Sequence, residues 1–311
     1  MLPEQLTVAI PTFERGEYVI ETVRELQRQT RRAGEILVVD QTAQHPRHVD
    51  GQLEQWHARG DIVWIRLSKP SVPMAMNQAL LRAKYATVLF LDDDIVPSAS
   101  LIEAHTTNYV QDRAWAVVGQ ILQPGQSPEL GNVARPKRPK NLWEDLDFPF
   151  NGNRRQEVAN CMAGNFSVRR DRALQVGGFD ENFIGVAYRF ETEFCRRLLQ
   201  QGGTVVFEPK ASIRHLQAAS GGSRARVDQP LRSSQPDHSV GDYYFALRQG
   251  VGVEKYSYTV NRMFRSVRTT YHLKHPWWIP VKLVGECRGL LLARRMARRG
   301  PSLLVSDNCP V

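Results

Sequence analysis

Residues 87–94 read Thr-Val-Leu-Phe-Leu-Asp-Asp-Asp, an apolar run of high strand propensity that ends in three consecutive carboxylates. The apolar residues predict a strand buried on both faces, so the acids at 92–94 should lie where that strand leaves a sheet and meets solvent. Packing does not favour three acids at such a place. Two carboxylates one residue apart can instead hold Mg²⁺ or Mn²⁺ against a diphosphate, because these cations prefer carboxylate and phosphate oxygens.

Strand and helix patterns alternate on both sides of this run. Strands are expected at 6–11, 36–40, 62–67 and 115–121, and helices at 18–29, 49–59, 74–83 and 99–110. This order predicts an α/β fold with a mostly parallel sheet flanked by helices, and ligands at the carboxyl ends of the strands. Asp40 and the three acids both lie at such ends.

The composition divides the chain into three parts. Residues 1–216 carry the alternating pattern, and 217–239 are rich in Gly, Ser, Arg and Gln, which indicates a mobile loop or lid. Residues 240–311 indicate a basic amphipathic helical region. A long surface loop is expected at 124–156, and its basic run at 135–140 is more typical of a solvated loop than of a nucleic-acid patch.

The overall composition is that of an ordinary globular protein, with 42% hydrophobic and 23% charged residues in 311. The first residues lack the pattern of a secretory signal, and no apolar run approaches the roughly 20 residues of a membrane-spanning helix. The four cysteines show no paired or metal-binding spacing, which favours free thiols in a reducing compartment. We therefore expect a cytoplasmic protein.

The net charge of +9 is concentrated near the end of the chain. Residues 261–299 hold ten Lys or Arg and a single acid, Glu286, so the remainder is close to neutral and a nucleic-acid partner is not expected. Trp277, Trp278 and aliphatic residues are interleaved with these bases. The pattern fits a peripheral helix at the inner, anionic face of a membrane, and it fits equally a helical lid that packs its apolar stripe on the main domain.

A second candidate site begins at Phe190, from which an apolar residue recurs every fourth position and predicts the buried stripe of a helix. Glu193 has Arg197 four residues later, the spacing of a surface ion pair, and needs no catalytic explanation. Glu191 has no such partner and stands in the first turn beside the stripe. It is therefore the candidate for a functional carboxylate.

Several short motifs occur in a fixed order along the chain. They are Val-Ala-Ile-Pro-Thr-Phe at 8–13, Glu-Ile-Leu-Val-Val-Asp-Gln-Thr at 35–42, Ala-Met-Asn at 75–77, the acids at 92–94, Ala-Gly-Asn-Phe at 163–166, Gly-Gly-Phe-Asp-Glu at 177–181, and Glu-Thr-Glu-Phe at 191–194 followed by Arg197. Over residues 7–215 this ordered set resembles the family 2 glycosyltransferases, which have the nucleotide-sugar-binding GT-A fold.

The resemblance implies an inverting, metal-dependent transferase that moves a sugar from a nucleotide-diphosphate donor to a hydroxyl of a carbohydrate or lipid-linked acceptor. Its divalent cation would be Mg²⁺ or Mn²⁺. Such enzymes assemble surface polysaccharides or glycolipids, which is the role expected here.

The resemblance also implies roles for individual residues. Six of them would belong to the donor site: Pro11, Thr12, Asp40, Asn77, Asp92 and Asp93. Within this set Asp40 would pair with the nucleotide base, and Asp92 would approach the ribose. Asp94 would hold the metal, and His215, at the end of a strand, would reach the metal or the diphosphate. Glu191 falls at the position of the catalytic base.

Three positions depart from the family pattern. Phe190 stands where the first acid of a Glu-Asp pair is usual and Glu191 replaces its Asp, which leaves Glu193 as an alternative base. Met76 stands where an arginine often precedes the asparagine, so the diphosphate would have one cation fewer unless Arg224 or Arg226 supplies it.

Two other functions stay open at this stage. One is a non-catalytic binding or membrane-scaffold protein of the same fold that has lost the paired acids. The other is a metal-dependent nucleotidyltransferase, against which the lack of a Gly-rich phosphate loop and Walker lysine counts. The sequence identifies neither the sugar, nor the nucleotide base, nor the acceptor.

Overall fold

Alternating strands and helices form the first half of the chain in the computed structural model, which describes residues 5–111, 114–129, 139–144, 149–222 and 229–304. The elements are β1 (Thr7–Thr12), α1 (Gly16–Gln27), β2 (Glu35–Asp40), α2 (Arg47–Arg59), β3 (Val63–Arg66), α3 (Val72–Arg82) and β4 (Thr87–Leu91). Each lies within a few residues of the range expected from the sequence.

The second half adds strands of both directions to the same sheet. Its elements are β5 (Ile95–Pro97), α4 (Leu101–Gln111), β6 (Ala116–Leu122), β7 (Gln156–Val158), β8 (Asn165–Arg169), α5 (Arg170–Gln175), α6 (Phe190–Gln200) and β9 (Val205–His215). The strand order is β3-β2-β1-β4-β8-β6-β9-β5, with β7 paired to β9. Strands β3, β2, β1 and β4 are parallel, as are β6 and β9, whereas β8, β5 and β7 pair antiparallel. The predicted α/β class is confirmed.

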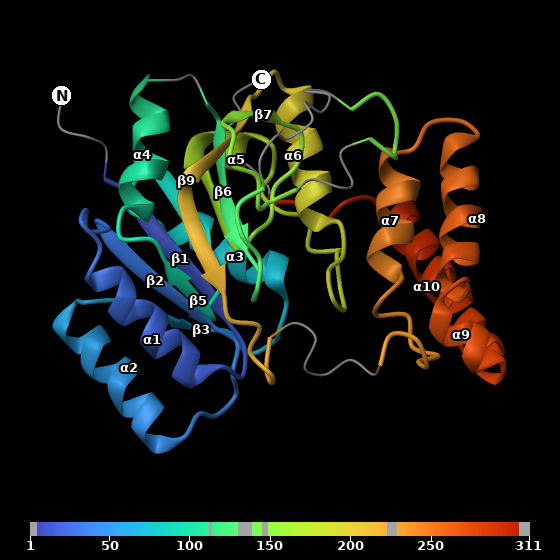
Figure 1. Ribbon diagram of the computed structural model, residues 1–311, viewed down its shortest axis with the longest axis horizontal. Coiled ribbons are helices and arrows are strands. Elements are labelled where there is room, and N and C mark those ends of the chain that lie inside the picture. Colours follow the sequence, from blue (N-terminus) through green and yellow to red (C-terminus); the bar gives the residue numbers. More distant parts are fainter. Residues whose placement is uncertain (1–4, 112–113, 130–138, 145–148, 223–228, 305–311) are drawn as a thin grey trace.

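Helices cover both faces of the sheet, which explains why its central strands are apolar throughout (Figure 1). Alternate residues of a strand point to opposite faces. Ala9, Leu37 and Phe90 pack in one apolar cluster with residues of α3 and α6. Their neighbours Val8 and Leu89 pack in the other with residues of α1, α2 and α4. The carboxyl ends of β1, β2 and β4 therefore lie at one edge of the sheet, with an apolar core packed on each of its two faces.

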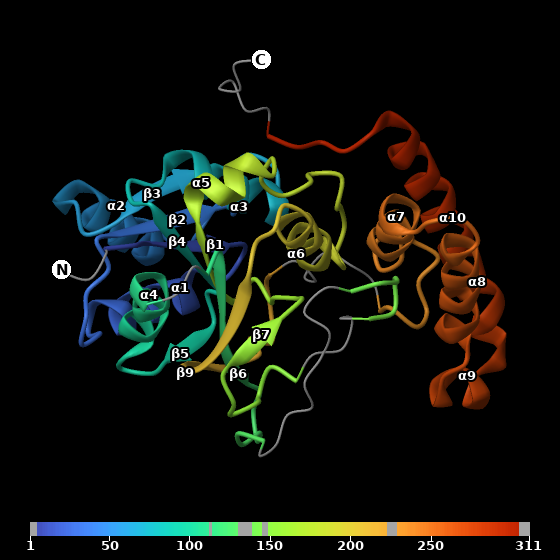
Figure 2. The same cartoon turned by 90° about the horizontal axis from the view of Figure 1, so that it is seen from above.

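The last part of the described chain is helical. It consists of α7 (Val240–Gln249), α8 (Glu254–Val267), α9 (Thr270–Lys274), the short 3₁₀ helix η1 (Pro276–Trp278) and α10 (Ile279–Arg299). Helix α7 contacts α6, and α10 packs along α7 and α8. These helices lie at one end of the long axis of the molecule, with α8 and α9 far from the sheet (Figures 1 and 2).

Residues 300–304 run back from α10 to the sheet domain (Figure 2). Leu304 N donates to Gly177 O at 2.8 Å, and Ser302 N donates to the carboxylate of Asp180 at 2.9 Å. The C-terminal helices thus contact the sheet domain at α6, at 177–181 and at Leu142, whose N–H donates to Glu254 of α8.

Some expectations fall outside the described residues, namely Arg224, Arg226 and most of the basic run at 135–140. In the described part of the chain, no helix has both the length and the apolar character required to traverse a bilayer.

Candidate functional site

The three consecutive acids lie at the carboxyl end of β4, as the sequence predicts. Strand β4 ends at Leu91, and the chain passes through 92–94 into the short strand β5. Asp92 is half-buried, whereas Asp93 and Asp94 are buried. The parallel pairing of β1 with both β2 and β4 brings the ends of all three strands to this edge.

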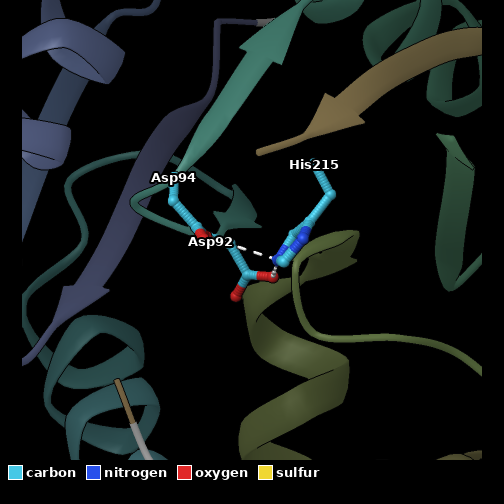
Figure 3. A group of neighbouring side chains, drawn as sticks. All are labelled: Asp92, Asp94 and His215. Carbon is cyan, nitrogen blue, oxygen red and sulfur yellow. Dashed lines mark ion pairs between the residues drawn. The ribbon is translucent and has the colours of Figure 1, made fainter. Parts of the chain in front are cut away.

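His215 reaches the acids because β5 pairs antiparallel with the end of β9, which sets Ile95 opposite His215. Its Nε2 atom lies 3.3 Å from Asp94 Oδ1 and 3.5 Å from Asp92 Oδ2, as Figure 3 shows. One ligand atom from each of the three residues lies within 4.8 Å of the others. We call Asp92, Asp94 and His215 the acid–histidine cluster. The two carboxylates raise the pKa of His215, first through the contact with Asp92.

The cluster fits a hard divalent cation. Asp94 Oδ2 accepts a hydrogen bond from Ala218 N at 2.8 Å, but Asp94 Oδ1 is buried and accepts none within the described chain. Gly164 leaves room beside the other carboxylate, because a Cβ atom there would lie 2.1 Å from Asp92 Oδ2. Asp94 Oδ1 is ion-paired with Arg15 and His215. The two carboxylates match the oxygen ligands that Mn²⁺ and Mg²⁺ prefer in proteins.

Asp93 faces the protein rather than the cluster. Its carboxylate accepts hydrogen bonds from Thr12 Oγ1 at 2.7 Å and Arg15 Nη1 at 3.0 Å, and its backbone oxygen accepts one from Thr22. Burial raises the pKa of Asp93 to about 7, although the charge of Arg15 acts against that rise. Two predicted donor residues, Thr12 and Asp93, are therefore bonded to each other, and Asp93 stands between the two acids of the cluster in the sequence.

Arg15 is a charged residue at the site that the sequence reasoning missed. Its Nη1 atom lies 3.0 Å from Asp93 Oδ1 and 3.1 Å from Asp94 Oδ1. Burial acts to lower the pKa of Arg15, but the two carboxylates outweigh it and the pKa is raised. The signal in the sequence was a basic residue three positions after the end of β1, at the edge of the sheet where ligands were expected. It supplies a cation here, whereas Met76 is buried in the core.

The residues that follow β9 cover the acids. Leu216 N donates to Asp94 O at 2.8 Å, and Gly222 N donates to Phe13 O at 2.7 Å. Arg15 Nε donates to Ser220 O at 3.0 Å. Residues 217–222, the first part of the segment expected to be a mobile loop or lid, are thus bonded to Asp94, which follows β4, and to Phe13 and Arg15, which follow β1.

Glu191 occupies the first turn of α6, as predicted, and faces the same region. Burial of its carboxyl raises its pKa to about 7, while hydrogen bonds from the backbone N–H groups of Glu191 and Ala163 act in the opposite direction. The charge of Asp92 contributes to the rise and that of Arg189 opposes it. Ala163 precedes the Gly164 that makes room for Asp92, so one short segment contacts both Glu191 and the acid–histidine cluster.

Glu193 corrects one expectation. The predicted ion pair with Arg197 is present, with three contacts between 2.8 and 3.0 Å. The pair is not on the surface, however, because Glu193 is only 3% exposed. Gln249 of α7 donates to the same carboxylate at 3.3 Å. The C-terminal helices pack on α6 and bury the side of the helix that carries Glu193, which the sequence pattern had predicted to be exposed.

Asp40 lies at the end of β2, at the predicted edge, and is fully buried. Its carboxylate contacts Thr42 N at 2.9 Å, His45 Nε2 at 2.7 Å and Trp64 Nε1 at 3.0 Å. Burial acts to raise the pKa of Asp40, but the hydrogen bonds from His45 and Thr42 outweigh it and the pKa is lowered. No contact in the described chain joins Asp40 to the acid–histidine cluster.

Asn77 and Pro11 complete the predicted donor set. The Asn77 side chain is buried and spans to the segment 177–181, donating to Phe179 O at 2.8 Å and to Glu181 Oε1 at 3.0 Å, and accepting from Phe179 N at 2.8 Å. It holds this segment against α3 and does not meet the cluster. Pro11 lies in β1 and keeps part of its surface exposed.

Comparison with known proteins agrees with this architecture. The profile of the protein family described as "Glycosyltransferase like family 2" matches residues 3–235, which is most of the chain. The match ends before α7, so the C-terminal helices lie outside it. No curated protein sequence matches the chain.

Three solved structures share the fold at low sequence identity. A mannosyltransferase from Pyrobaculum calidifontis, solved with GDP-Man and Mn²⁺, is 15% identical with a TM-score of 0.52, over 94% of this chain and 76% of that one. S. aureus TarS 1-349 is 13% identical with a TM-score of 0.56, over 92% and 81%. GalNAc-T7, solved with UDP, GalNAc and Mn²⁺, is 14% identical with a TM-score of 0.56, over 88% of this chain and 58% of that one. The chain thus spans little more than half of GalNAc-T7.

Proposed function

The chain belongs to the glycosyltransferase family 2, and on this premise we propose that it is an inverting, metal-dependent enzyme that transfers a sugar from a nucleoside diphosphate to a hydroxyl group. The observation that carries the proposal is the acid–histidine cluster together with Glu191, because one short segment, 163–164, contacts both.

The cluster is the proposed metal and diphosphate site. Asp94 and His215 would hold Mn²⁺ or Mg²⁺ together with Asp92, and the bound cation would offset the charge of the leaving diphosphate. Two structural neighbours were solved with a nucleotide and Mn²⁺, which supports such a donor site here. Arg15, held against Asp93 and Asp94, adds a fixed positive charge at the same edge.

Glu191 is the proposed general base. Its carboxylate takes the proton from the acceptor hydroxyl as that oxygen forms a bond to the anomeric carbon. The bond from this carbon to the diphosphate oxygen breaks at the same time, and its electron pair leaves with the nucleoside diphosphate. A single displacement of this kind inverts the anomeric configuration. A pKa of about 7 suits a base that accepts a proton near neutral pH.

The six residues predicted to bind the donor differ in solvent exposure, and we assign their roles accordingly. Pro11 and Asp92 keep exposed surface, and we assign them direct contact with the nucleotide. Asp40 is buried at the end of β2 and bonded to Thr42, His45 and Trp64, so we assign it the positioning of these partners at the base end of the donor site. Thr12 and Asp93 hold Arg15 in place. Asn77 supports the donor site through the segment 177–181.

The acceptor is proposed to be a carbohydrate, free or lipid-linked, in the assembly of surface polysaccharide or glycolipid. We assign donor binding and chemistry to residues 1–216, a cover over the donor to 217–239, and a separate function to 240–311. The bonds from 217–222 to Asp94 and Phe13 support the second assignment.

The test is release of nucleoside diphosphate from a panel of UDP-, GDP- and dTDP-sugars in Mn²⁺ and in excess EDTA. Metal-dependent release of nucleoside diphosphate is expected, with NMR of any transfer product showing inversion. Release of pyrophosphate would favour a nucleotidyltransferase. Tight binding of a nucleotide sugar without turnover would favour a non-catalytic protein.

A further inference from the structure

Helix α8 presents an apolar stripe to solvent. Val253, Tyr256, Val260 and Phe264 follow one another at spacings of three, four and four residues, which places them on one side of the helix. All four are exposed, and Phe264 is 68% exposed. Tyr258, Thr259 and Ser266 are buried on the opposite side. Helix α8 therefore packs on its neighbours through its other side, and the four residues of the apolar stripe take no part in that packing.

A second exposed row continues from η1 along α10. Trp277, Val284 and Leu291 stand seven residues apart and are all exposed, Trp277 by 63%. Arg288 and Arg295 lie between and beyond them at helical spacing and are exposed too. Trp278, the neighbouring tryptophan, is half-buried, with the Arg232 guanidinium 5.9 Å from its ring centroid. Apolar and basic side chains thus alternate along one side of α10.

The exposed charges of the C-terminal helices are basic, since Asp242 and Glu286 are buried and Glu254, at the start of α8, is half-buried and bonded to Leu142 N. Within the described residues 255–304 the only carboxylate is that of Glu286, which is fully buried. It contacts Lys282 Nζ at 2.8 Å and Tyr243 Oη at 2.7 Å. The exposed bases of this stretch are Arg265, Arg268, Lys274, Arg288, Arg294, Arg295, Arg298 and Arg299. Both apolar rows therefore lie on helices whose exposed charges are positive.

The position of these helices leaves that surface accessible. Figures 1 and 2 show α8 and α9 at the end of the molecule remote from the sheet, with α7 between α8 and α6. The inward face has its own core, in which Tyr258, Ala293 and Met296 are buried. The fold does not require the outward apolar side chains, and exposed groups of this kind rimmed by one sign of charge mark an interaction surface.

We infer that the outward face of α8, α9 and α10 docks on an anionic lipid surface. Its apolar side chains would enter the headgroup region while the arginines and Lys274 contact lipid phosphates, as amphipathic interfacial helices do. A second copy of the chain is a poorer occupant, because two such faces would bring like charges together. The inference does not depend on the proposed transferase activity.

The test is co-sedimentation of the full chain with vesicles of phosphatidylcholine, alone or with 30 mol% phosphatidylglycerol. The protein should pellet with the anionic vesicles at low salt and be released as salt rises, because screening shortens the reach of the charges. Each basic side chain near such a surface raises partitioning about fivefold, so Arg288→Gln with Arg295→Gln should lower it about 25-fold. Phe264→Ser should lower it as well, by about tenfold.

Matched controls lie on the sheet domain. Arg82→Gln with Lys84→Gln removes two exposed charges there, and Leu81→Ser removes an exposed apolar group. Both controls should pellet like wild type, and all variants should keep its melting temperature. Equal pelleting with neutral vesicles, no pelleting at low salt, or equal losses in the controls would overturn the inference. A dimer in solution that Phe264→Ser disperses would also overturn it, since a second copy would then cover the face.

Discussion

Arg189 Nε lies 3.6 Å from Asp242 Oδ1, and this contact joins the residue two positions before Glu191 to the first turn of α7. Asp242 is held in turn by Tyr258 Oη at 2.6 Å and Arg262 Nε at 2.7 Å. Close backbone packing adds to the link, because a Cβ atom on Gly241 would lie 2.4 Å from Tyr188 O. The C-terminal helices therefore fix the start of α6, where the proposed base stands.

Substitution of the proposed base, Glu191, should affect catalysis much more than substitution of the nearby Glu193. Glu191→Gln should lower kcat by about 10²- to 10⁴-fold with little change in donor affinity, as removal of a general base does. Steady-state kinetics with the donor found in the panel measures both constants. An unchanged kcat would exclude Glu191 as the base.

Glu193→Gln is the matched control, and its expected effect follows from its burial. The substitution weakens a buried ion pair with Arg197, so it should lower the melting temperature. It should retain most of the wild-type kcat under conditions where the variant stays folded. A larger loss of kcat for Glu193→Gln than for Glu191→Gln would move the base to position 193.

Activity should depend on pH through Glu191. A base must be ionised, and the pKa of this carboxyl is raised to about 7. Turnover should therefore rise with pH, about tenfold per pH unit well below 7, and level off above it. A profile of kcat against pH measures this, and Glu191→Gln should abolish the dependence. A wild-type plateau that already begins near pH 5 would contradict the assignment.

Arg189 should help to set the pKa of Glu191, and therefore the midpoint of the pH profile. Its positive charge lowers the pKa of Glu191, so its removal in Arg189→Gln should shift the midpoint of the pH profile upward. Arg189→Lys keeps the charge and should restore most of the wild-type midpoint. If both variants lose activity while the midpoint stays in place, Arg189 serves the packing of α6 alone.

Gly164 should be needed for metal binding. In Gly164→Ala the new Cβ atom would lie 2.1 Å from Asp92 Oδ2, so this carboxylate must move. We expect Mn²⁺ affinity, measured by calorimetry, to fall about tenfold or more as a ligand is displaced. Gly51→Ala, where nothing lies within 4 Å, is the control and should bind like wild type. Equal affinities for the two variants would show that Asp92 does not hold the metal.

The sequence predicted the sheet and the acids because their signals are local. Apolar strands such as β4 and amphipathic helices such as α1 are recognised within a few residues. His215 could be named from the family resemblance, but its contact with Asp94 could not be derived. That contact depends on β5, a strand of three residues too short to give a pattern of its own.

Other parts of the site depend on partners distant in sequence. Arg15 meets Asp93 across 78 positions, and no spacing rule connects them. The partner of Glu193 followed from helical spacing, but its burial depends on Gln249, 56 positions later. Asn77 matched a family motif, yet its amide is used by Phe179 and Glu181 rather than exposed at the cluster. The sequence located these residues, and tertiary packing determined their surroundings.

The central claim is that the acid–histidine cluster binds a divalent cation together with a nucleoside diphosphate. The most direct measurement is the melting temperature of wild type and Asp94→Ala with UDP, GDP, ADP or dTDP, in Mn²⁺ and in excess EDTA. A ligand that binds the native state at about 100 times its Kd should raise the wild-type melting temperature by a few degrees. We expect this rise for at least one nucleotide in Mn²⁺ only, and none for folded Asp94→Ala. An equal rise in EDTA, or an equal rise in Asp94→Ala, would contradict the account.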